Sequence, residues 1–454
     1  MKRICIVSGD GHAGTRVADY RDYMPARYHG ALKEVEQEER DFLLVTAGQS
    51  RFPEEALAVI DDRSAIRSGG QSGGWDPARR VREMDQEGVV AEIIHQGHQH
   101  ASMPFFSITN RPRPPELRQV GAEAYHRWLA EHMAATGGRA FGVADPGPCH
   151  DMNAAVRELR WVADHGFVSV GVPGVVADSA LPPLYDAHFD PFWAACQELG
   201  LVLSIHAGWG LEQGLFFRFA DMMTGGQSIE QAARDGKFLA MGEELKKSRR
   251  SPNALGMQPR RAMWQLMLGG VFDRFPGLKL ALTEIRAEWI PATLAYLDAS
   301  VAESGVRIAH SPGEYFRRNC YVTPSSPKIE EIAMRHDIGV DRFIFGTDYP
   351  HPEGTWPNTR EWLKTIFTGV EESEARMILG ENAIDCYNLD RGKLLAIAER
   401  IGPLPDQILI RDYQPDAAMI ADFDRRANFK VPPEEVDLAV LGELVSEDCR
   451  QLAG

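Results

Sequence analysis

Runs of apolar and β-branched residues of strand length recur along the chain at wide spacing, and segments with helical periodicity lie between them. This alternation predicts parallel β/α units. Most of the runs are apolar on both faces, as expected of parallel strands that are covered on both sides. The eight predicted strands are "ICIVSGD" (4–10), "VVAEIIH" (89–95), "AFGVAD" (140–145), "FVSVGVP" (167–173), "LVLSIH" (201–206), "LKLALTE" (278–284), "CYVT" (320–323) and "RFIFGTD" (342–348).

Eight strands with intervening helices favour an α/β fold of the closed (β/α)8 TIM-barrel type over residues 1–390. Helical patterns such as "PELRQVGAEAYHRWLAEHMAAT" and "MNAAVRELRWVADHG" separate the strands. A doubly wound open sheet is the competing interpretation. No GxGxxG or GxxxxGK motif follows any strand, which disfavours a nucleotide-binding fold of that kind.

Three segments fall outside the repeat. Residues 15–80 form a predicted loop insertion with a glycine-rich stretch, "SGGQSGGW" (68–75), which we interpret as a mobile loop over the barrel mouth or as a plain linker. A second loop insertion, about 210–257, ends in "EELKKSRR", which is more typical of a solvated helix face than of a binding patch. Residues 391–454 are predicted to form a helical extension that packs on the barrel or on another subunit.

Composition narrows the range of partners. The 454 residues carry a formal net charge of -16 without a block of lysine and arginine, so neither nucleic acid nor a membrane surface is an expected partner. Six scattered cysteines suit reduced thiols, and the first apolar run is too short for a signal peptide. We expect a cytoplasmic homo-oligomer, such as a dimer, that acts on a small-molecule substrate.

Polar residues gather at the C-terminal ends of the predicted strands, which a barrel brings together around one mouth. Asp10 and His12 lie two apart after the first strand, His206 ends the fifth, and Asp348 ends the eighth. Two imidazoles and two carboxylates suit one divalent ion, with zinc as the first choice and iron or manganese as the others. Such an ion provides a hydroxide nucleophile at neutral pH, and Asp348 could take the proton.

Each of these residues also has a simpler explanation when it is taken alone. A histidine at a strand end is commonly a hydrogen-bonded core or surface residue, and an aspartate after a strand commonly caps a helix. Four such residues at three strand ends together favour the metal site.

Further candidates lie at the ends of other strands. Glu284 ends the sixth strand and is a candidate catalytic base, a support for a metal-bound histidine or a ligand of a second ion; an ion pair with Arg286 is the structural alternative. Three histidines, His95, His98 and His100, follow the second strand. They could bind the substrate, shuttle a proton or hold a second metal, and a solvated loop is the alternative. We predict His98 as a catalytic residue and His95 as a substrate contact.

Arg286, His351 and Trp209 complete the predicted substrate contacts. His351 lies between two prolines just after Asp348, where a cap or a hydrogen-bonding role is the simpler explanation. Trp209 and Trp356 could wall the pocket, although aromatic residues at such places more often serve packing.

The motifs also resemble a known family. Through "SGDGHAG", "PARRVREMDQEGVVAEII", "GTDYPHP" and "GENA", the chain is similar to the amidohydrolase superfamily, in particular to the amidohydrolase-2 group that includes aminocarboxymuconate semialdehyde decarboxylase and the resorcylate-type decarboxylases. The resemblance implies metal-ligand roles for Asp10, His12, His206 and Asp348, with Asp348 also relaying a proton.

Departures from that family shape the expected chemistry. Asp10 stands where many members have histidine, and the fourth strand has no lysine to be carbamylated, so one metal is the default. The decarboxylases have a catalytic histidine after the sixth strand, whereas this chain has Glu284 and Glu288 in "TEIRAEWIP". We therefore predict a metal-dependent hydrolase of an ester, amide or thioester. Nonhydrolytic decarboxylation of an aromatic or unsaturated acid is the alternative, and a barrel that only binds or assembles is a third hypothesis.

Overall fold

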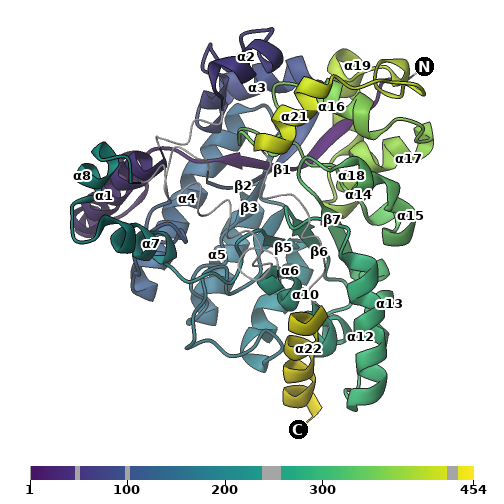
Figure 1. Cartoon of the computed structure of the whole chain (residues 1–454). Helices are drawn as coiled ribbons and strands as arrows, with labels where there is room; N and C mark the ends of the chain where they lie inside the picture. The colour runs from purple at the N-terminus through teal and green to yellow at the C-terminus, as the bar shows by residue number, and fades with distance from the viewer. Residues whose placement is uncertain (1, 47–51, 98–102, 238–256, 427–437, 454) are drawn as a thin grey trace.

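The computed structural model describes residues 2–46, 52–97, 103–237, 257–426 and 438–453. Seven parallel strands form one curled sheet in chain order, and helices cover its outer side (Figure 1). This architecture confirms the predicted fold class. The strands are β1 (Ile6–Ala13), β2 (Val89–Gln96), β3 (Ala140–Ala144), β4 (Ser169–Gly171), β5 (Val202–His206), β6 (Leu280–Thr283) and β7 (Cys320–Thr323).

The eighth predicted strand, 342–348, makes isolated bridges rather than a regular strand. Its backbone still bonds to both ends of the sheet. The amide of Ile344 donates to the carbonyl of Val322 in β7, and the amide of Gly9 in β1 donates to the carbonyl of Phe345, each at 2.8 Å. The segment therefore closes the barrel, and we call it the closing segment.

The "GENA" motif, residues 380–383, supports the closing segment. The Asn382 side chain donates to two backbone carbonyls, one of them that of Phe343 at 2.7 Å. The amide of Phe345 donates to the carbonyl of Ile378 at 3.0 Å, and this bond outside the sheet interrupts the regular strand ladder. The motif therefore fixes the chain that leads into the barrel mouth.

The helices between the strands begin and end as their sequences predict. The Asp151 side chain accepts two backbone amides at the start of α5, and α6 ends at Gly200 with a φ of 71°. No helix of the described ranges is long and apolar enough to cross a membrane. These helices are α4 (Pro115–Ala135), α5 (Met152–Asp164), α6 (Asp190–Leu199), α10 (Gln258–Leu268), α11 (Val271–Arg274), α12 (Ile290–Ser304), α13 (Pro312–Asn319), α14 (Ile329–Ala333), α15 (Arg335–Ile338), α16 (Thr359–Ile366), α17 (Glu372–Arg376) and α18 (Asn382–Cys386).

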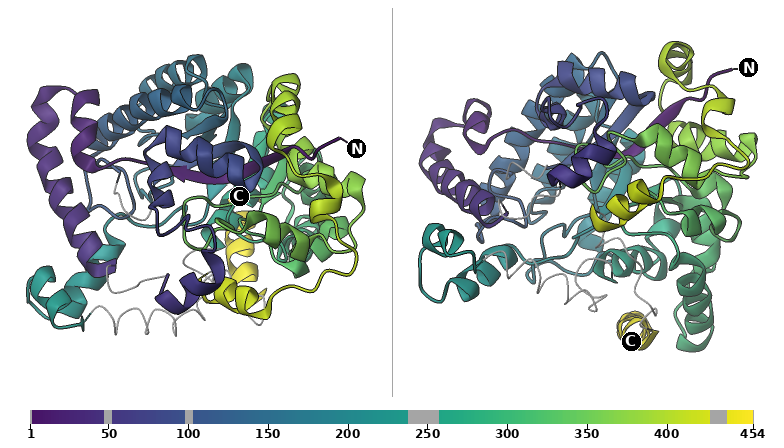
Figure 2. Two further views of the ribbon diagram at one scale, coloured as in Figure 1. Left: turned by 90° about the horizontal axis from the view of Figure 1, so that it is seen from above. Right: turned by 45° about the horizontal axis from the view of Figure 1, so that its top comes forward.

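In the residues that the structure describes, both insertions contain helices, which corrects the prediction of loops. The first carries α1 (His29–Thr46), α2 (Glu54–Ile60) and α3 (Pro77–Glu87), and the second carries α7 (Leu215–Thr224) and α8 (Ile229–Arg234). Helices α1, α7 and α8 gather at one edge of the molecule (Figure 2). They bury an apolar cluster of their own, in which Val45 of α1 meets residues of α7 and α8. The charged run "EELKKSRR" lies outside the described residues.

The C-terminal extension packs on the barrel through α19 (Arg391–Ile401), α20 (Pro405–Ile408), α21 (Ala417–Arg426) and α22 (Leu438–Ala453). Leu394 of α19 belongs to the apolar cluster that contains residues of β2. The buried Asp448 of α22 accepts a hydrogen bond from Nε1 of Trp264 in α10 at 2.7 Å. Arg426 of α21 donates to the carbonyl of Gly354 at 3.2 Å, in the turn after the closing segment.

The glycine-rich stretch 68–75 is a packed turn, neither a mobile loop nor a linker. The Tyr349 hydroxyl donates to the carbonyl of Gly70 at 2.5 Å, and a Cβ atom at Gly73 would overlap that hydroxyl. Trp356 is buried against the same turn, where a Cβ atom at Gly70 would overlap its ring, so this tryptophan serves packing. The turn holds the residues that follow Asp348.

Exchange of Gly73 for alanine is expected to destabilise the protein by about 1–3 kcal/mol, because the added methyl group displaces Tyr349. The measurement is the thermal unfolding midpoint. Gly30→Ala in α1 is the matched control, since a Cβ atom there meets nothing within 4 Å. An unchanged midpoint for Gly73→Ala would contradict the tight packing of the turn.

Candidate metal centre

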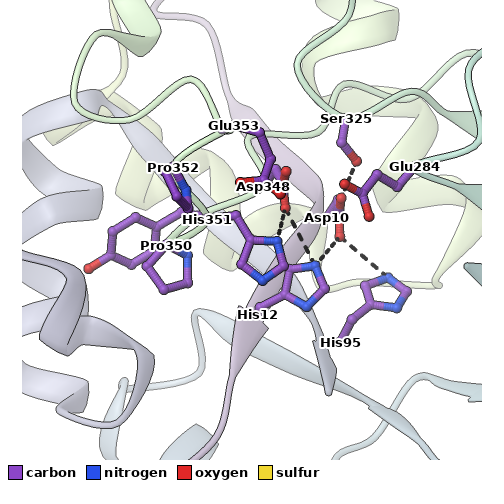
Figure 3. Close-up of polar contacts among 12 residues, drawn as sticks. Asp10, His12, His95, Glu284, Ser325, Asp348, Pro350, His351, Pro352 and Glu353 are labelled. Carbon is purple, nitrogen blue, oxygen red and sulfur yellow. Dashed lines mark hydrogen bonds and ion pairs between the residues drawn. The ribbon is translucent and has the colours of Figure 1, made fainter. Parts of the chain in front are cut away.

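The barrel gathers acidic and imidazole side chains from distant parts of the chain at the C-terminal ends of its strands. Asp10 and His12 belong to β1, His206 ends β5, Glu284 follows β6, and Asp348 lies in the closing segment. Figure 3 shows Asp10, His12, Glu284 and Asp348 turned toward one another. The meeting of residues so far apart in sequence follows from the barrel topology.

Four of these side chains form a compact group. Nε2 of His12 lies 3.5 Å from Oδ1 of Asp10, while Nε2 of His206 lies 3.6 Å from the same oxygen and 3.4 Å from Oε2 of Glu284. All four ligand atoms lie within 4.8 Å of one another, which suits a single ion. We call these four residues the first ligand group. Asp348 stands at its border, with Oδ1 3.5 Å from Nε2 of His12.

The imidazoles of the first ligand group are oriented for coordination. Nδ1 of His12 is 3.1 Å from the carbonyl oxygen of Gln96, and Nδ1 of His206 is 3.1 Å from that of Ala207. Each ring therefore donates from Nδ1 and presents the lone pair of Nε2. Within the described ranges, neither Nε2 atom nor Oδ1 of Asp10 has a hydrogen-bond partner, although all three are buried. Buried polar atoms are normally satisfied, so these atoms fit a bound cation.

The carboxylates also favour positive charge at this place. Burial would lower the pKa of His206, but Asp10 and Glu284 raise it to about 9. Burial would raise the pKa of Asp10, but the neighbouring His206 and His12 hold it well below its usual range. The group thus stabilises a proton on His206, or a cation in its place.

Two further predicted residues border the group. Nε2 of His95 lies 4.0 Å from Oδ1 of Asp10, and burial with a neighbouring imidazole lowers the pKa of His95 to about 3, so its ring is neutral. Nδ1 of His351 lies 3.0 Å from Oδ1 of Asp348, and the His351 ring stacks on His12 with centroids 3.9 Å apart. Burial would lower the pKa of His351, but Asp348 raises it to about 9.

The other predicted contacts lie in the surrounding loops. Arg286 forms ion pairs with Glu288 at 3.3 Å and with Glu331 at 3.2 Å. Arg286 therefore has structural ion pairs with Glu288 and Glu331. Trp209 donates from Nε1 to a backbone carbonyl in the loop after β4 at 3.0 Å. His98, like His100, lies outside the described residues.

A sequence profile described as amidohydrolase matches residues 55–389. The chain belongs to this amidohydrolase family. The resemblance predicted from the motifs is thereby confirmed. The matched region of the chain contains His206, Glu284 and Asp348, whereas Asp10 and His12 precede it.

The chain is similar to several decarboxylases. It is 27% identical over 325 residues to the gamma-resorcylate decarboxylase of Polaromonas sp. (strain JS666). The aligned region covers 69% of this chain and 87% of that protein. The gamma-resorcylate decarboxylase of Rhodococcus jostii (strain RHA1) is 27% identical over 327 residues, with the same coverage. The structure of the dihydroxybenzoic acid decarboxylase from Polaromonas sp. JS666, with bound manganese and the inhibitor 2-nitroresorcinol, matches with a TM-score of 0.55 at 22% identity and covers 87% of this chain and 99% of that one.

The sequence analysis missed two residues of the candidate metal centre. Ser325, after β7, donates from its hydroxyl to Oδ2 of Asp10. Glu353, buried in the turn after the closing segment, has a ligand atom within 4.8 Å of those of Glu284 and Asp348. The position of Ser325 just after a predicted strand was a usable signal, but a serine there does not stand out from ordinary turn residues.

Three residues in or next to the candidate metal centre have left-handed backbone conformations. The φ angles are 59° at Glu284, 64° at Arg286 and 61° at Asp348. Each such conformation costs about 1–3 kcal/mol in a residue other than glycine and persists where the surrounding structure fixes it, often at functional sites. The loop after β6 and the end of the closing segment are therefore held in place by their surroundings.

A buried ion pair supports β1 beneath the centre. Nε of Arg80 lies 2.8 Å from Oε2 of Glu92, and Nη1 of Arg80 donates to the carbonyl of His12 at 2.8 Å. Both side chains are buried. Arg80 thus ties β2 to the backbone of a residue in the first ligand group.

Exchange of Arg80 for methionine is expected to destabilise the protein by about 3–5 kcal/mol, since it leaves Glu92 buried without its cation. Thermal unfolding measures the effect. Arg400→Met, at an exposed position of α19, is the control. If the Arg80→Met protein unfolded at the wild-type temperature, the pair would not be the support inferred here.

Proposed function

We propose that the protein is a divalent-metal-dependent, nonhydrolytic decarboxylase of an aromatic acid with a hydroxyl group next to its carboxylate. One observation carries the proposal: the first ligand group converges in the barrel mouth, with buried lone pairs that fit a cation. The similarity to decarboxylases supports this reaction among those that such a centre allows. It favours the alternative of the sequence analysis over hydrolysis, the first choice of that analysis.

We place one cation in the first ligand group and propose manganese instead of zinc. Carboxylate-rich donor sets suit Mn²⁺, and two carboxylates face two imidazoles here. The Polaromonas structure and that of the 5-carboxyvanillate decarboxylase from Novosphingobium aromaticivorans DSM 12444 contain manganese. When bound, the ion would polarise the carboxylate and hydroxyl oxygens of the substrate.

The side chains around the ion would handle the proton. Decarboxylation breaks the bond between the ring and the carboxylate carbon, so CO₂ leaves and the ring carbon keeps the electron pair and takes up a proton. Asp348 and His351, 3.0 Å apart at the border of the first ligand group, are placed to hold and deliver this proton. Neutral His95, with Nε2 4.0 Å from Oδ1 of Asp10, is placed to bind a substrate oxygen.

Hydrolysis is the second candidate because of Glu284. Its Oε2 lies 3.4 Å from Nε2 of His206, so this carboxylate is placed to accept a proton from an attacking water. The reaction would take an ester, amide or thioester and would need no proton delivery to carbon.

Product analysis separates the two reactions. The manganese-loaded protein is incubated in deuterated water with 2,6-dihydroxybenzoate or 5-carboxyvanillate, and in parallel with aryl esters and amides. Decarboxylation predicts release of CO₂ and a deuterium atom on the ring carbon that carried the carboxylate. Cleavage of an ester or amide with labelled oxygen from water in the product acid, and no CO₂ from either acid, would overturn the proposal.

A further inference from the structure

An arginine near the barrel mouth is buried with a guanidinium nitrogen that lacks a hydrogen-bond partner. Arg260, in the first turn of α10, is only 9% exposed, and its Nε atom has no partner in the part of the chain that the structure describes. Burial lowers the pKa of Arg260 to about 10, so the side chain stays charged at neutral pH. Buried arginines are normally paired, and a buried charge without its hydrogen bonds is costly. This arrangement points to an anionic ligand.

We propose that Arg260, together with Arg286, binds a second carboxylate of the substrate, apart from the carboxylate that leaves. The substrate would then be an aromatic diacid. The proposal rests on the proposed function, because it concerns the substrate of that reaction, and it goes beyond that function by assigning residues to a second acidic group.

The first turn of α10 lies at the mouth of the barrel. α10 packs on β5 and leads through α11 to the start of β6, so its own start lies at the opposite end, where the strands end (Figure 1). A Cβ atom at Gly210, in the loop that follows His206, would lie 3.3 Å from Cβ of Gln258, the first residue of α10. Arg260 therefore lies near the loop after β5, on the side of the mouth that holds His206.

The indole of Trp289 holds the guanidinium beside the loop after β6. The Cζ atom of Arg260 lies 4.7 Å from the centroid of the Trp289 ring. Nε1 of Trp289 donates to the carbonyls of Ile285 at 2.8 Å and Arg286 at 3.0 Å, so the indole is fixed against the residues that follow Glu284. Stacking on an aromatic ring stabilises a cation but satisfies none of its N–H groups. The contact therefore orients the guanidinium without replacing an anion.

Arg286 supplies a second donor, because the neighbouring carboxylates do not satisfy both arginines. Its Nη1 lies 3.2 Å from Oε2 of Glu331 but is buried without a hydrogen-bond partner within the described ranges. Burial raises the pKa of Glu331 to about 7, so this carboxyl is only partly ionised at neutral pH. Glu288 lies 3.3 Å from Nε of Arg286, and its charge also acts on Arg260. The two arginines therefore keep positive charge and donor atoms for an anion.

Positive charge at this place also favours the entry of an acidic substrate. Asp10, Glu284 and Asp348 bring three carboxylates to the metal centre, and one divalent cation compensates two of these charges. An approaching anion also meets the formal net charge of -16 that the whole chain carries. A guanidinium group matches a carboxylate in shape and can donate two parallel hydrogen bonds to it. A carboxylate is therefore the anion that we expect here.

Binding of an unreactive diacid tests the site apart from turnover. Isophthalate has two carboxylates and no hydroxyl group next to either, and 3-carbamoylbenzoate replaces one carboxylate with a neutral amide of similar shape. Calorimetric titration of the manganese-loaded protein should show about 10- to 100-fold tighter binding of isophthalate by the wild type, and equal affinities in Arg260→Met. Arg317→Met, at an exposed position of α13, should keep the preference. No preference in the wild type, or an unchanged preference in Arg260→Met, would overturn the proposal.

Turnover and stability give a second readout. Arg260→Met should lower kcat/KM for 5-carboxyvanillate, which has a second carboxylate, at least about 10-fold more than kcat/KM for 2,6-dihydroxybenzoate. The thermal unfolding midpoint should not fall, because methionine also packs on an aromatic ring and removes an unpaired buried charge. Equal losses for both acids with a lowered midpoint would assign Arg260 a structural role and contradict the proposal. If the wild type released CO₂ from neither acid but Arg260→Met abolished the isophthalate preference, the proposed function would fail and the anion site would be supported.

Discussion

Exchange of Asp348 for asparagine is expected to lower turnover by about 100- to 10,000-fold while the fold is retained. Asparagine has nearly the same shape as aspartate, but it can neither hold a proton nor carry a negative charge. Asp348 is buried between His12 and His351, where both properties matter for proton delivery. The measurement is kcat with the manganese-saturated enzyme, together with the circular dichroism spectrum and the metal content.

Asp164→Asn, at an exposed position of α5, is the matched control and should turn over like the wild type. Turnover close to that of the wild type in Asp348→Asn would rule out the proton role. If that variant lost both metal and turnover, Asp348 would be a ligand of the ion rather than a residue at its border.

Exchange of His206 for alanine is expected to weaken manganese binding by more than about 100-fold. Loss of a residue that only hydrogen-bonds to a metal ligand weakens binding by about 10- to 100-fold, and loss of a ligand itself should cost more. His206 supplies an oriented Nε2 lone pair close to both Asp10 and Glu284. Turnover at stoichiometric manganese should therefore vanish. Manganese affinity is measured by calorimetric titration of metal-free protein.

The control for this variant is His336→Ala, because the side chain of His336 is 60% exposed and lies in the outer helix α15. It should bind manganese like the wild type. Unchanged affinity in His206→Ala would exclude this residue as a ligand.

The parts of the centre that could be predicted are those at the ends of regular strands. Asp10, His12 and His206 each end or follow an apolar run, and parallel strands in a barrel present those ends at one mouth. The membership of Glu284 in the first ligand group could not be deduced, because a carboxylate after β6 has several roles open to it. Distances to His206 were needed to place it.

Other features depend on contacts between distant segments, which no local pattern reveals. The glycine-rich stretch 68–75 was interpreted as a loop or linker, but Tyr349 and Trp356 pack on it from the other end of the barrel. The closing segment has the apolar pattern of a strand. The amide of Phe345 in this segment nevertheless donates its hydrogen bond to the carbonyl of Ile378, outside the sheet. The insertions were missed as helices because distant segments cover their apolar residues: Ile229 of α8, for example, packs in one cluster with Val45 of α1.

The claim that β1, β5 and the loop after β6 together bind a divalent cation is tested most directly by anomalous X-ray diffraction from crystals of the manganese-loaded protein, with data collected on both sides of the manganese absorption edge. We predict an anomalous peak among Asp10, His12, His206 and Glu284. An ordered centre without such a peak, or with manganese bound only elsewhere, would contradict the claim.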